Sequence, residues 1–407
     1  MKQDIIDSVD ARLAIHGGPM VRPDGMPPRI ALGPAEEAAI LECIAHYRNL
    51  GLDPGYQNVF EERYCAEFAH RLGGGHADLV STGTAALFIA IRTLHLPEGS
   101  EVLVSPITDP GTISAIILNG LRPKLIDSAP NTLNIGLEQV EQAFSPQTRA
   151  IVVVHCAGQA APVDEIVAFA RAKNILVVED CSQSHGASLN GRCVGTFGDI
   201  AAFSTMHRKA HMTGGSGGLV FSRDEEMFQR ALAHADRGKP RWRDDFNDRD
   251  PNQFLFPALN FHSDEISAAI GLSSIRRLDA TIQARRAFIA GLEKALTEVP
   301  TCEIYPARAD DSPFIYPLRV RTETISCSKV AFGEAVFAEG IGLNPDYKYL
   351  VADWPFAKNH LVGGGDTPNA RKVIATHLCL YVNENYGAQE VADCITALNK
   401  VSRHFRI

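Results

Sequence analysis

The chain has 407 residues, of which 45% are hydrophobic and 21% are charged, so it can form two or three domains with a sizeable core. Its formal net charge of −9 argues against nucleic acid or an anionic membrane as the main partner, because both require a basic face. The nine cysteines form no Cys-x-x-Cys pair and no run approaches the roughly 18 apolar residues of a membrane span, so we expect a cytoplasmic protein with reduced thiols and no metal site.

The chain begins with a polar segment, residues 1–35, which is rich in glycine and proline and is predicted to be an extended arm. Its start carries acids where a signal peptide would be basic and then apolar. Apolar residues at helical spacing predict helices over 34–49 and 60–72, and three glycines at 73–75 end the second helix.

From about residue 77, short apolar runs alternate with helical segments. This alternation predicts a largely parallel sheet that is covered by helices on both faces. Ligands of such sheets gather beyond the carboxyl ends of the strands, so we expect a site there. The predicted strands are 79–80, 102–104, 124–126, 150–154, 175–178, 201–203 and 219–221, and the predicted helices are 84–94, 112–118 and 163–172.

The composition changes in the second half of the chain. Residues 236–257 are dense in charge and are interpreted either as a solvated loop or, alternatively, as a lid or a phosphate-facing loop. A long helical stretch follows over 263–296, and a smaller α/β unit is expected from about 312, ending in a helix over 388–401. We therefore predict an arm (1–35), a large domain (36–275) and a small C-terminal domain (276–407).

Three motifs at the expected edge of the sheet carry candidate chemistry, and the first is Ser81-Thr82-Gly83-Thr84-Ala85-Ala86 between a strand and a helix. Glycine lets the backbone approach a bound group, and the free N–H groups of a helix start attract an anion. Gly83 and Thr84 are therefore candidate phosphate ligands. The alternative is a plain helix cap, since many helices begin in this way.

The second motif places Asp180 at the end of a buried strand. A buried carboxylate requires a partner, and a protonated ring nitrogen would suit it; the alternative is an Asp that caps the next turn. Gln183 follows and could hydrogen-bond an oxygen on the same ring. His185 could lie against that ring or act only as a cap.

The third motif is Lys209, which lies between the apolar residues 201–203 and the glycine-rich residues 214–218. Most lysines are surface charges, but a lysine between buried segments requires a function, and a Schiff base would remove the buried ammonium charge. Ser204 precedes it and is placed to bind a phosphate. The glycine-rich run could be a flexible linker, although the apolar strand that follows favours a tight turn. A lysine, a strand-end acid and a phosphate loop together are the parts that hold pyridoxal 5′-phosphate.

With these residues the chain resembles the DegT/DnrJ/EryC1/StrS family of sugar and cyclitol aminotransferases, which have the fold of type I pyridoxal-phosphate enzymes. The resemblance covers most of the chain and rests on the combined pattern rather than on any one motif. The matching segments are Phe60-Glu61-Glu62 through Phe68-Ala69, Ser81 to Leu87, Val154-His155 with Gly158-Gln159, Glu179-Asp180 with Gln183 to Ala187, Phe203-Ser204 with Lys209 and Gly214 to Gly218, and Asn260-Phe261 with Glu265 and Ala268 to Gly271.

The resemblance implies a role for each of the candidate residues. Lys209 would carry the Schiff base and then act as general base, and Asp180 would pair with the ring nitrogen. Gln183 would contact the ring oxygen. Asn260 would reach the phosphate of a neighbouring subunit, which implies a homodimer with shared sites. Gly83, Thr84 and Ser204 would bind the phosphate in the chain's own site.

The chain departs from the family pattern at positions that handle the substrate. Asp109 follows Thr108 where the family usually has an aromatic that stacks on the cofactor ring, so either another group covers that face or Asp109 contacts the substrate. Pro162 replaces a usual Asp, and His262-Ser263 replaces a usual Arg-Met. By resemblance, loop 236–257 and residues 344–349, with Tyr347 among them, would line the acceptor pocket.

The implied reaction moves an amino group from glutamate or glutamine to a keto-sugar, nucleotide-linked by expectation, or to a keto-cyclitol, in amino-sugar or antibiotic biosynthesis. One alternative is a pyridoxamine-dependent sugar dehydratase on the same scaffold. In that branch a histidine replaces the lysine, so Lys209 argues against it while His207 keeps it open. The other alternative is a non-catalytic, cofactor-binding regulator, and the set of Lys209, Asp180 and Gln183 argues against it.

Overall fold

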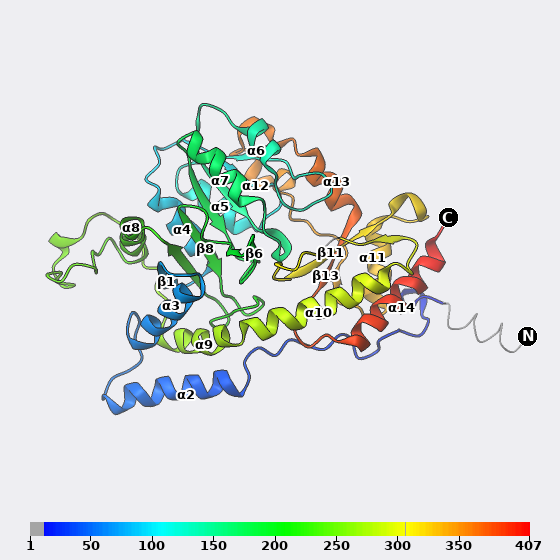
Figure 1. Cartoon of the computed structure of the whole chain (residues 1–407), viewed down its shortest axis with the longest axis horizontal. Coiled ribbons are helices and arrows are strands. Elements are labelled where there is room, and N and C mark those ends of the chain that lie inside the picture. Colours follow the sequence, from blue (N-terminus) through cyan, green and yellow to red (C-terminus); the bar gives the residue numbers. More distant parts are fainter. Residues whose placement is uncertain (1–11, 306) are drawn as a thin grey trace, which may run out of the picture.

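The computed structural model describes residues 12–305 and 307–407, so the start of the predicted arm lies outside the described residues. Figure 1 shows a larger unit built on one sheet and a smaller unit built on a second sheet, with the long helix α10 running beneath both. This is the α/β architecture with a mostly parallel central sheet that the sequence predicts.

The central sheet has seven strands in the order β1-β9-β8-β5-β4-β2-β3. β9 runs antiparallel to both of its neighbours, and the remaining pairs are parallel. The strands carry apolar side chains on both faces of the sheet, as expected for a sheet that is covered on both sides. The strands are β1 (His76–Val80), β2 (Glu101–Val104), β3 (Arg122–Leu125), β4 (Thr148–Val154), β5 (Leu176–Asp180), β8 (Ile200–Ser204) and β9 (Gly218–Ser222).

Helices cover both faces of this sheet. On one face, Val80, Ala202 and Val220 pack in a core with α4, α5 and α8. On the other face, one core is formed with α3 and α9 and another with α6 and α7. The helices of the larger unit are α2 (Pro34–Asn49), α3 (Val59–Arg71), α4 (Gly83–Thr93), α5 (Pro110–Leu118), α6 (Leu137–Ala143), α7 (Val163–Ala172), α8 (Glu225–Ala235) and α9 (Glu265–Arg276), and a short hairpin joins β6 (Ser188–Leu189) to β7 (Arg192–Cys193).

The smaller unit is an antiparallel sheet in the order β10-β11-β13-β12, packed against helices. It has its own hydrophobic core, to which Leu13 of the arm also contributes. The boundaries of the arm, the large domain and the small domain stay predictions. The elements of this part are α10 (Leu278–Leu296), β10 (Cys302–Glu303), β11 (Ile315–Val320), α11 (Lys329–Ala338), β12 (Leu343–Asn344), α12 (Pro355–Lys358), α13 (Pro368–Thr376), β13 (His377–Tyr381) and α14 (Ala388–Phe405).

The structure differs from the predicted elements in several places, and α6 is one helix that was not predicted. The helical stretch 263–296 is two helices, because the chain breaks at Arg277 between α9 and α10. The two predicted strands at 314–316 and 318–320 are the single strand β11, and the helix α8 was not predicted. None of the helices in the described part of the chain is long and apolar enough to cross a membrane.

Candidate active site

A cavity of about 1170 Å³ opens at the carboxyl edge of the central sheet, between the two units and the N-terminal arm. Its floor is made by the ends of three strands, at Val154, Asp180 and Ser204, and by the start of α4. This is the position that the parallel topology predicts for a ligand. The cavity also receives Lys209 from the loop after β8.

Lys209 is half-buried, and its ammonium nitrogen lies 4.4 Å from the centre of the Phe314 ring. Burial lowers the pKa of Lys209 to about 8, although Asp180 and Asp109 act in the opposite direction. A minority of the amine is therefore neutral near physiological pH, which is far more than at the ordinary lysine pKa. A neutral amine can act as a nucleophile or as a general base.

Asp180 ends β5 and is 3% exposed. One carboxylate oxygen accepts a hydrogen bond from the Thr112 hydroxyl at 2.8 Å, and the other accepts from the Ser182 N–H at 3.1 Å. Thr112 in turn pairs with the Thr108 hydroxyl at 2.8 Å. These bonds hold the carboxylate in one orientation at the cavity wall.

Gln183 extends this wall on the side of the smaller unit. Its side-chain oxygen accepts a hydrogen bond from the Ala157 N–H at 2.8 Å, and its side chain also bonds to Tyr347. Tyr347 is 8% exposed, and its ring centre lies 4.6 Å from that of Tyr349. Both predicted residues, Gln183 and Tyr347, line the cavity.

The start of α4 forms one corner of the cavity. Thr82 caps the helix, and its hydroxyl oxygen accepts from the Ala85 N–H at 2.9 Å. The N–H groups of Gly83 and Thr84, at the start of the first turn, have no acceptor within the helix. A Cβ at Gly83 would lie 2.5 Å from the Ser204 Cβ, and one at Gly218 would lie 2.3 Å from the Thr82 carbonyl oxygen. Glycine is therefore required at both positions for the two loops to meet.

Thr84 and Asp109 are neighbours at the cavity wall beside this corner, since both lie next to Gly111. Thr84 is exposed, and a Cβ at Gly111 would lie 2.4 Å from its hydroxyl oxygen. Asp109 is also exposed, and its carboxylate accepts from the Gly111 N–H at 2.9 Å as the cap of α5. The carboxylate keeps a free edge that can meet a ligand.

Two predicted residues are not among the described residues that line this cavity. His185 lies behind the wall, 2% exposed, with its Nε2 2.7 Å from the Ser204 carbonyl oxygen, and burial lowers its pKa to about 4. It supports Ser204 from behind. Asn260 is exposed, and its side-chain oxygen accepts from the His262 N–H at 3.0 Å.

Loop 236–257 contributes none of the described residues that line the cavity of this chain, which corrects the expectation that it lines the pocket within one chain. Figure 1 shows this segment extending beside α8, away from the smaller unit. Its base is held by Asp236, which is buried and ion-paired at 2.7 Å to Arg237 and to Arg241. These pairs lower the pKa of Asp236 against the effect of burial, which would raise it.

Thr112, Arg208 and Phe314 are among the cavity residues for which the sequence predicts no role. Thr112 had a signal, because it and Ser114 are the two hydroxyl residues of an otherwise apolar helix, and a buried hydroxyl needs a partner. Arg208 was visible as a second cation beside Lys209. Phe314 had no local signal, because only the packing of the smaller unit brings it to the lysine loop.

Comparison with known proteins gives consistent results. The model of the DegT/DnrJ/EryC1/StrS aminotransferase family matches residues 54–399. A putative L-glutamine:3-amino-2,3-dideoxy-scyllo-inosose aminotransferase of Streptoalloteichus tenebrarius is 35% identical over 371 residues, 86% of each chain. GDP-perosamine synthase of Escherichia coli O157:H7 is 32% identical over 55% of this chain and 60% of its own.

Solved structures agree in fold. The aminotransferase TlmJ of Streptoalloteichus hindustanus superposes with a TM-score of 0.81 at 26% identity, over 92% of this chain and 97% of its own. The E. coli GDP-4-keto-6-deoxy-D-mannose-3-dehydratase has a TM-score of 0.82 at 23% identity, over 90% and 97%, and this shows a shared fold alone. The chain belongs to the DegT/DnrJ/EryC1/StrS aminotransferase family.

Proposed function

We propose that this chain is a pyridoxal-phosphate-dependent aminotransferase that moves an amino group from glutamate or glutamine to a keto-cyclitol or a keto-sugar. The observation that carries the proposal is the placement of Lys209 and Asp180 in one cavity, with a lysine pKa of about 8. Lys209 also argues against the dehydratase alternative, in which a histidine would stand at this position.

The residues present fit pyridoxal phosphate. The N–H groups at Gly83 and Thr84 and the hydroxyl of Ser204 would hold its phosphate, because a helix start attracts an anion. Asp180 would pair with the ring nitrogen, and Gln183 would contact the ring oxygen. When bound, the cofactor supplies an electron-poor ring that stabilises negative charge on the α-carbon of the donor.

Three side chains of the chain itself would have separate functions in the reaction. Lys209 would bond the cofactor aldehyde and, once displaced by the donor, take the proton from the donor's α-carbon. Asp180 would keep the ring nitrogen protonated, because the carboxylate is fixed by Thr112 and Ser182. Phe314 covers the lysine from the smaller unit, and this contact limits the access of water to the amine.

The homodimer with shared sites is part of this proposal. Asn260 is exposed, residues 241–257 are exposed or half-buried, and all of them lie away from the chain's own cavity, so they are free to contribute to the site of a partner subunit. All nine cysteines are free, which supports the reducing environment of the cytoplasm.

The acceptor proposal is tested by isotope transfer. The purified protein with pyridoxal phosphate and glutamine or glutamate, ¹⁵N-labelled at the α-amino group, is incubated with a panel of keto-cyclitols and nucleotide-linked keto-hexoses. We expect one acceptor class to gain a ¹⁵N-amine in place of its carbonyl oxygen, detected by mass spectrometry. A product that loses a hydroxyl without gaining nitrogen would instead identify a dehydratase.

The amino-acid donor is supported by Arg208, which lines the cavity directly before Lys209. Among the described residues its guanidinium has no hydrogen-bond or ion-pair partner, so it is available for a carboxylate. We expect Arg208→Ala to raise KM for the donor about 10- to 100-fold, the value of a charge-assisted hydrogen bond, with KM for the acceptor unchanged. Steady-state kinetics with each substrate varied in turn measures both.

Arg208→Lys is the matched control, because it keeps the charge and loses the two-pronged geometry. It should restore part of the donor affinity. An equal rise of both KM values in Arg208→Ala would mean that the side chain shapes the cavity in general and does not select the donor carboxylate.

A further inference from the structure

The N-terminal arm crosses the smaller unit and ends against the lysine loop. Near residue 22 it is fixed by Arg22, which is paired at 2.6 Å to Asp393 and at 2.8 Å to Glu390 on α14. Further along, the Asn383 side chain donates to the Pro27 carbonyl oxygen at 3.0 Å. The arm is thus held along its length, and residues 27–29 reach the cavity.

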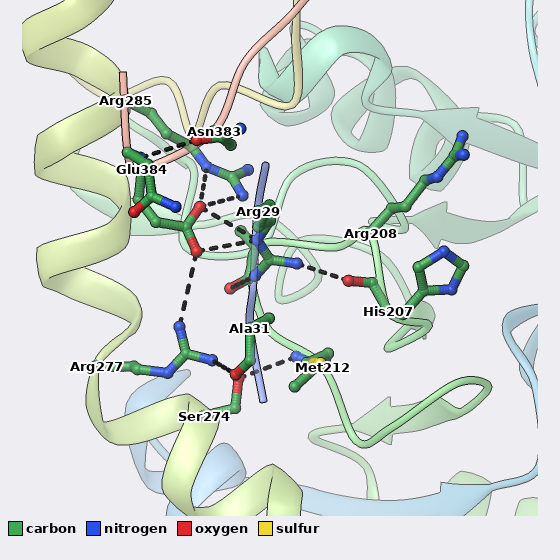
Figure 2. Close-up of polar contacts among 12 residues, drawn as sticks. Arg29, Ala31, His207, Arg208, Met212, Ser274, Arg277, Arg285, Asn383 and Glu384 are labelled. Atoms are coloured by element: carbon green, nitrogen blue, oxygen red, sulfur yellow. Dashed lines mark hydrogen bonds and ion pairs between the residues drawn. The ribbon is translucent and has the colours of Figure 1, made fainter. Parts of the chain in front are cut away.

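Arg29 joins this arm to the loop that carries Lys209. Its guanidinium donates to the His207 carbonyl oxygen at 2.7 Å and to the Ala210 carbonyl oxygen at 3.2 Å. Figure 2 shows Arg29 lying against this loop, between His207 and Glu384. The two acceptors flank Lys209 in the chain, so one planar side chain holds the backbone on both sides of it.

Glu384 fixes Arg29 in turn. Its carboxylate accepts from the Arg29 Nε at 2.9 Å and from the Arg285 Nη2 at 2.8 Å, and Arg277 lies 3.7 Å away. Arg285 is 1% exposed, so this carboxylate is needed to compensate its buried positive charge. Figure 2 shows the three arginines converging on Glu384. The cluster joins the arm, α10, the end of α9 and the loop after β13.

The lysine loop has little regular structure of its own to hold it. The Lys209 N–H donates to the Met206 carbonyl oxygen at 2.9 Å, and the Met212 N–H donates to the Ser274 hydroxyl at 3.1 Å (Figure 2). Between these two bonds, the carbonyl groups of 207 and 210 are held by Arg29. A reaction slows greatly when the reacting amine is misplaced by about 1 Å. The hydrogen bonds from Arg29 to the loop should therefore affect the rate of the reaction at Lys209.

We propose that Arg29, oriented by Glu384, is a positioning residue that holds the loop so that the Lys209 amine faces Asp180 in the cavity. The inference deepens the proposed function and rests on it for its effect on turnover. Its effect on the amine itself does not depend on turnover. Removing Arg29 leaves Glu384 paired with Arg285 and Arg277, so no buried charge becomes isolated and the fold is retained.

The test compares Arg29→Ala with Arg22→Ala in the full chain. Both changes remove an arginine that fixes the arm to the smaller unit, but Arg22 does not contact the lysine loop. The first readout is the pH dependence of Lys209 labelling by an amine-reactive reagent in cofactor-free protein, followed by peptide mass spectrometry. In the wild type the midpoint is expected near the lysine pKa of about 8.

We expect Arg29→Ala to move this midpoint upward, because a freed loop exposes the amine to water and lessens the burial that lowers its pKa. Turnover should fall about 10- to 100-fold, as for a misplaced reacting group, and the affinity for pyridoxal phosphate should fall with it. Arg22→Ala should leave the midpoint unchanged and turnover within about twofold of the wild type. Arg29→Lys should restore part of the effect.

Equal changes in the two variants would overturn the proposal, because they would show that the arm acts only through general stability. An unchanged labelling midpoint in Arg29→Ala would also overturn it. If Arg29→Ala does not fold, Arg29→Gln gives the same comparison, since it keeps a polar side chain of similar reach, removes the guanidinium and leaves Glu384 paired with Arg285 and Arg277. A wild type that transfers no amine would refute the proposed function, whereas the labelling comparison would still decide the role of Arg29.

Discussion

Replacing Lys209 with alanine is expected to lower amine transfer by at least about 10³-fold, the upper part of the range for losing a general acid–base group. The variant loses both the covalent link to the cofactor and the base that moves the proton. No other described lysine lines the cavity, so the chain has no substitute for it. Single-turnover mixing with the donor, followed by absorbance, measures the loss.

The same variant should bind pyridoxal phosphate more weakly while its thermal unfolding temperature stays close to that of the wild type or rises. The reason is that the buried amine costs stability in its charged form, and alanine removes this cost. Lys124→Ala is the control, because Lys124 is a partly buried lysine on β3 of the same sheet, 3.4 Å from Glu101 and away from the cavity. Full transfer activity in Lys209→Ala would refute the assignment.

A raised stability of Lys209→Ala should depend on pH in a defined way. The pKa of Lys209 is about 8 in the folded chain and higher in the unfolded chain, where the amine is hydrated. Between these two values the unfolded state binds more protons, so the wild type gains stability as pH rises. The advantage of the alanine variant should therefore be largest below pH 8 and shrink above it.

The predicted parts of the site are those whose signals are local in sequence. Asp180 follows a continuous apolar strand, and Lys209 lies between a strand and a glycine turn, so their placement at one edge of the sheet follows from strand order alone. The same reasoning located Gly83 and Ser204, which the structure brings within van der Waals contact. Parallel strands present their carboxyl ends together, and this rule needs no side-chain information.

The missed parts come from segments that are distant in sequence. Arg29 and Phe314 meet the lysine loop, and Glu384 meets Arg29, only because the arm and the smaller unit pack over the loop. The glycine and proline content predicted that the arm is extended and gave it no function. This composition carries no information about which part of the fold the arm contacts. The helix break at Arg277 was missed for the same reason: Arg277 has ordinary helical character, and its side chain turns to Glu36 at 2.9 Å and toward Glu384.

The neighbouring acids Glu179 and Asp180 illustrate how structure separates two roles that sequence leaves together. Glu179 is fully buried and accepts from the N–H groups of Gly195, Phe197 and Gly198, each at 2.7 Å. Burial alone would raise its pKa, but its bond to His155 and these backbone donors lower the pKa below the usual value. Glu179 is thus a structural anchor, and Asp180 faces the cavity.

Asp180→Asn should therefore lower turnover by about 10³-fold with little loss of stability. The amide keeps the size of the side chain but removes the negative charge that would keep the ring nitrogen protonated. The fold tolerates the change, because the Thr112 hydroxyl can reverse its role and accept from the new amide while it donates to Thr108. Steady-state turnover and thermal unfolding, measured on the same preparation, give the two numbers.

Glu179→Gln is the matched control for Asp180→Asn, since it removes a charge from the adjacent residue. It leaves buried N–H groups facing an amide that can satisfy fewer of them, so it should lower stability more than Asp180→Asn does. The two variants should thus show opposite profiles. If Asp180→Asn instead loses stability and keeps its turnover per folded molecule, then Asp180 is a second anchor, and the charge that faces the ring nitrogen must come from elsewhere.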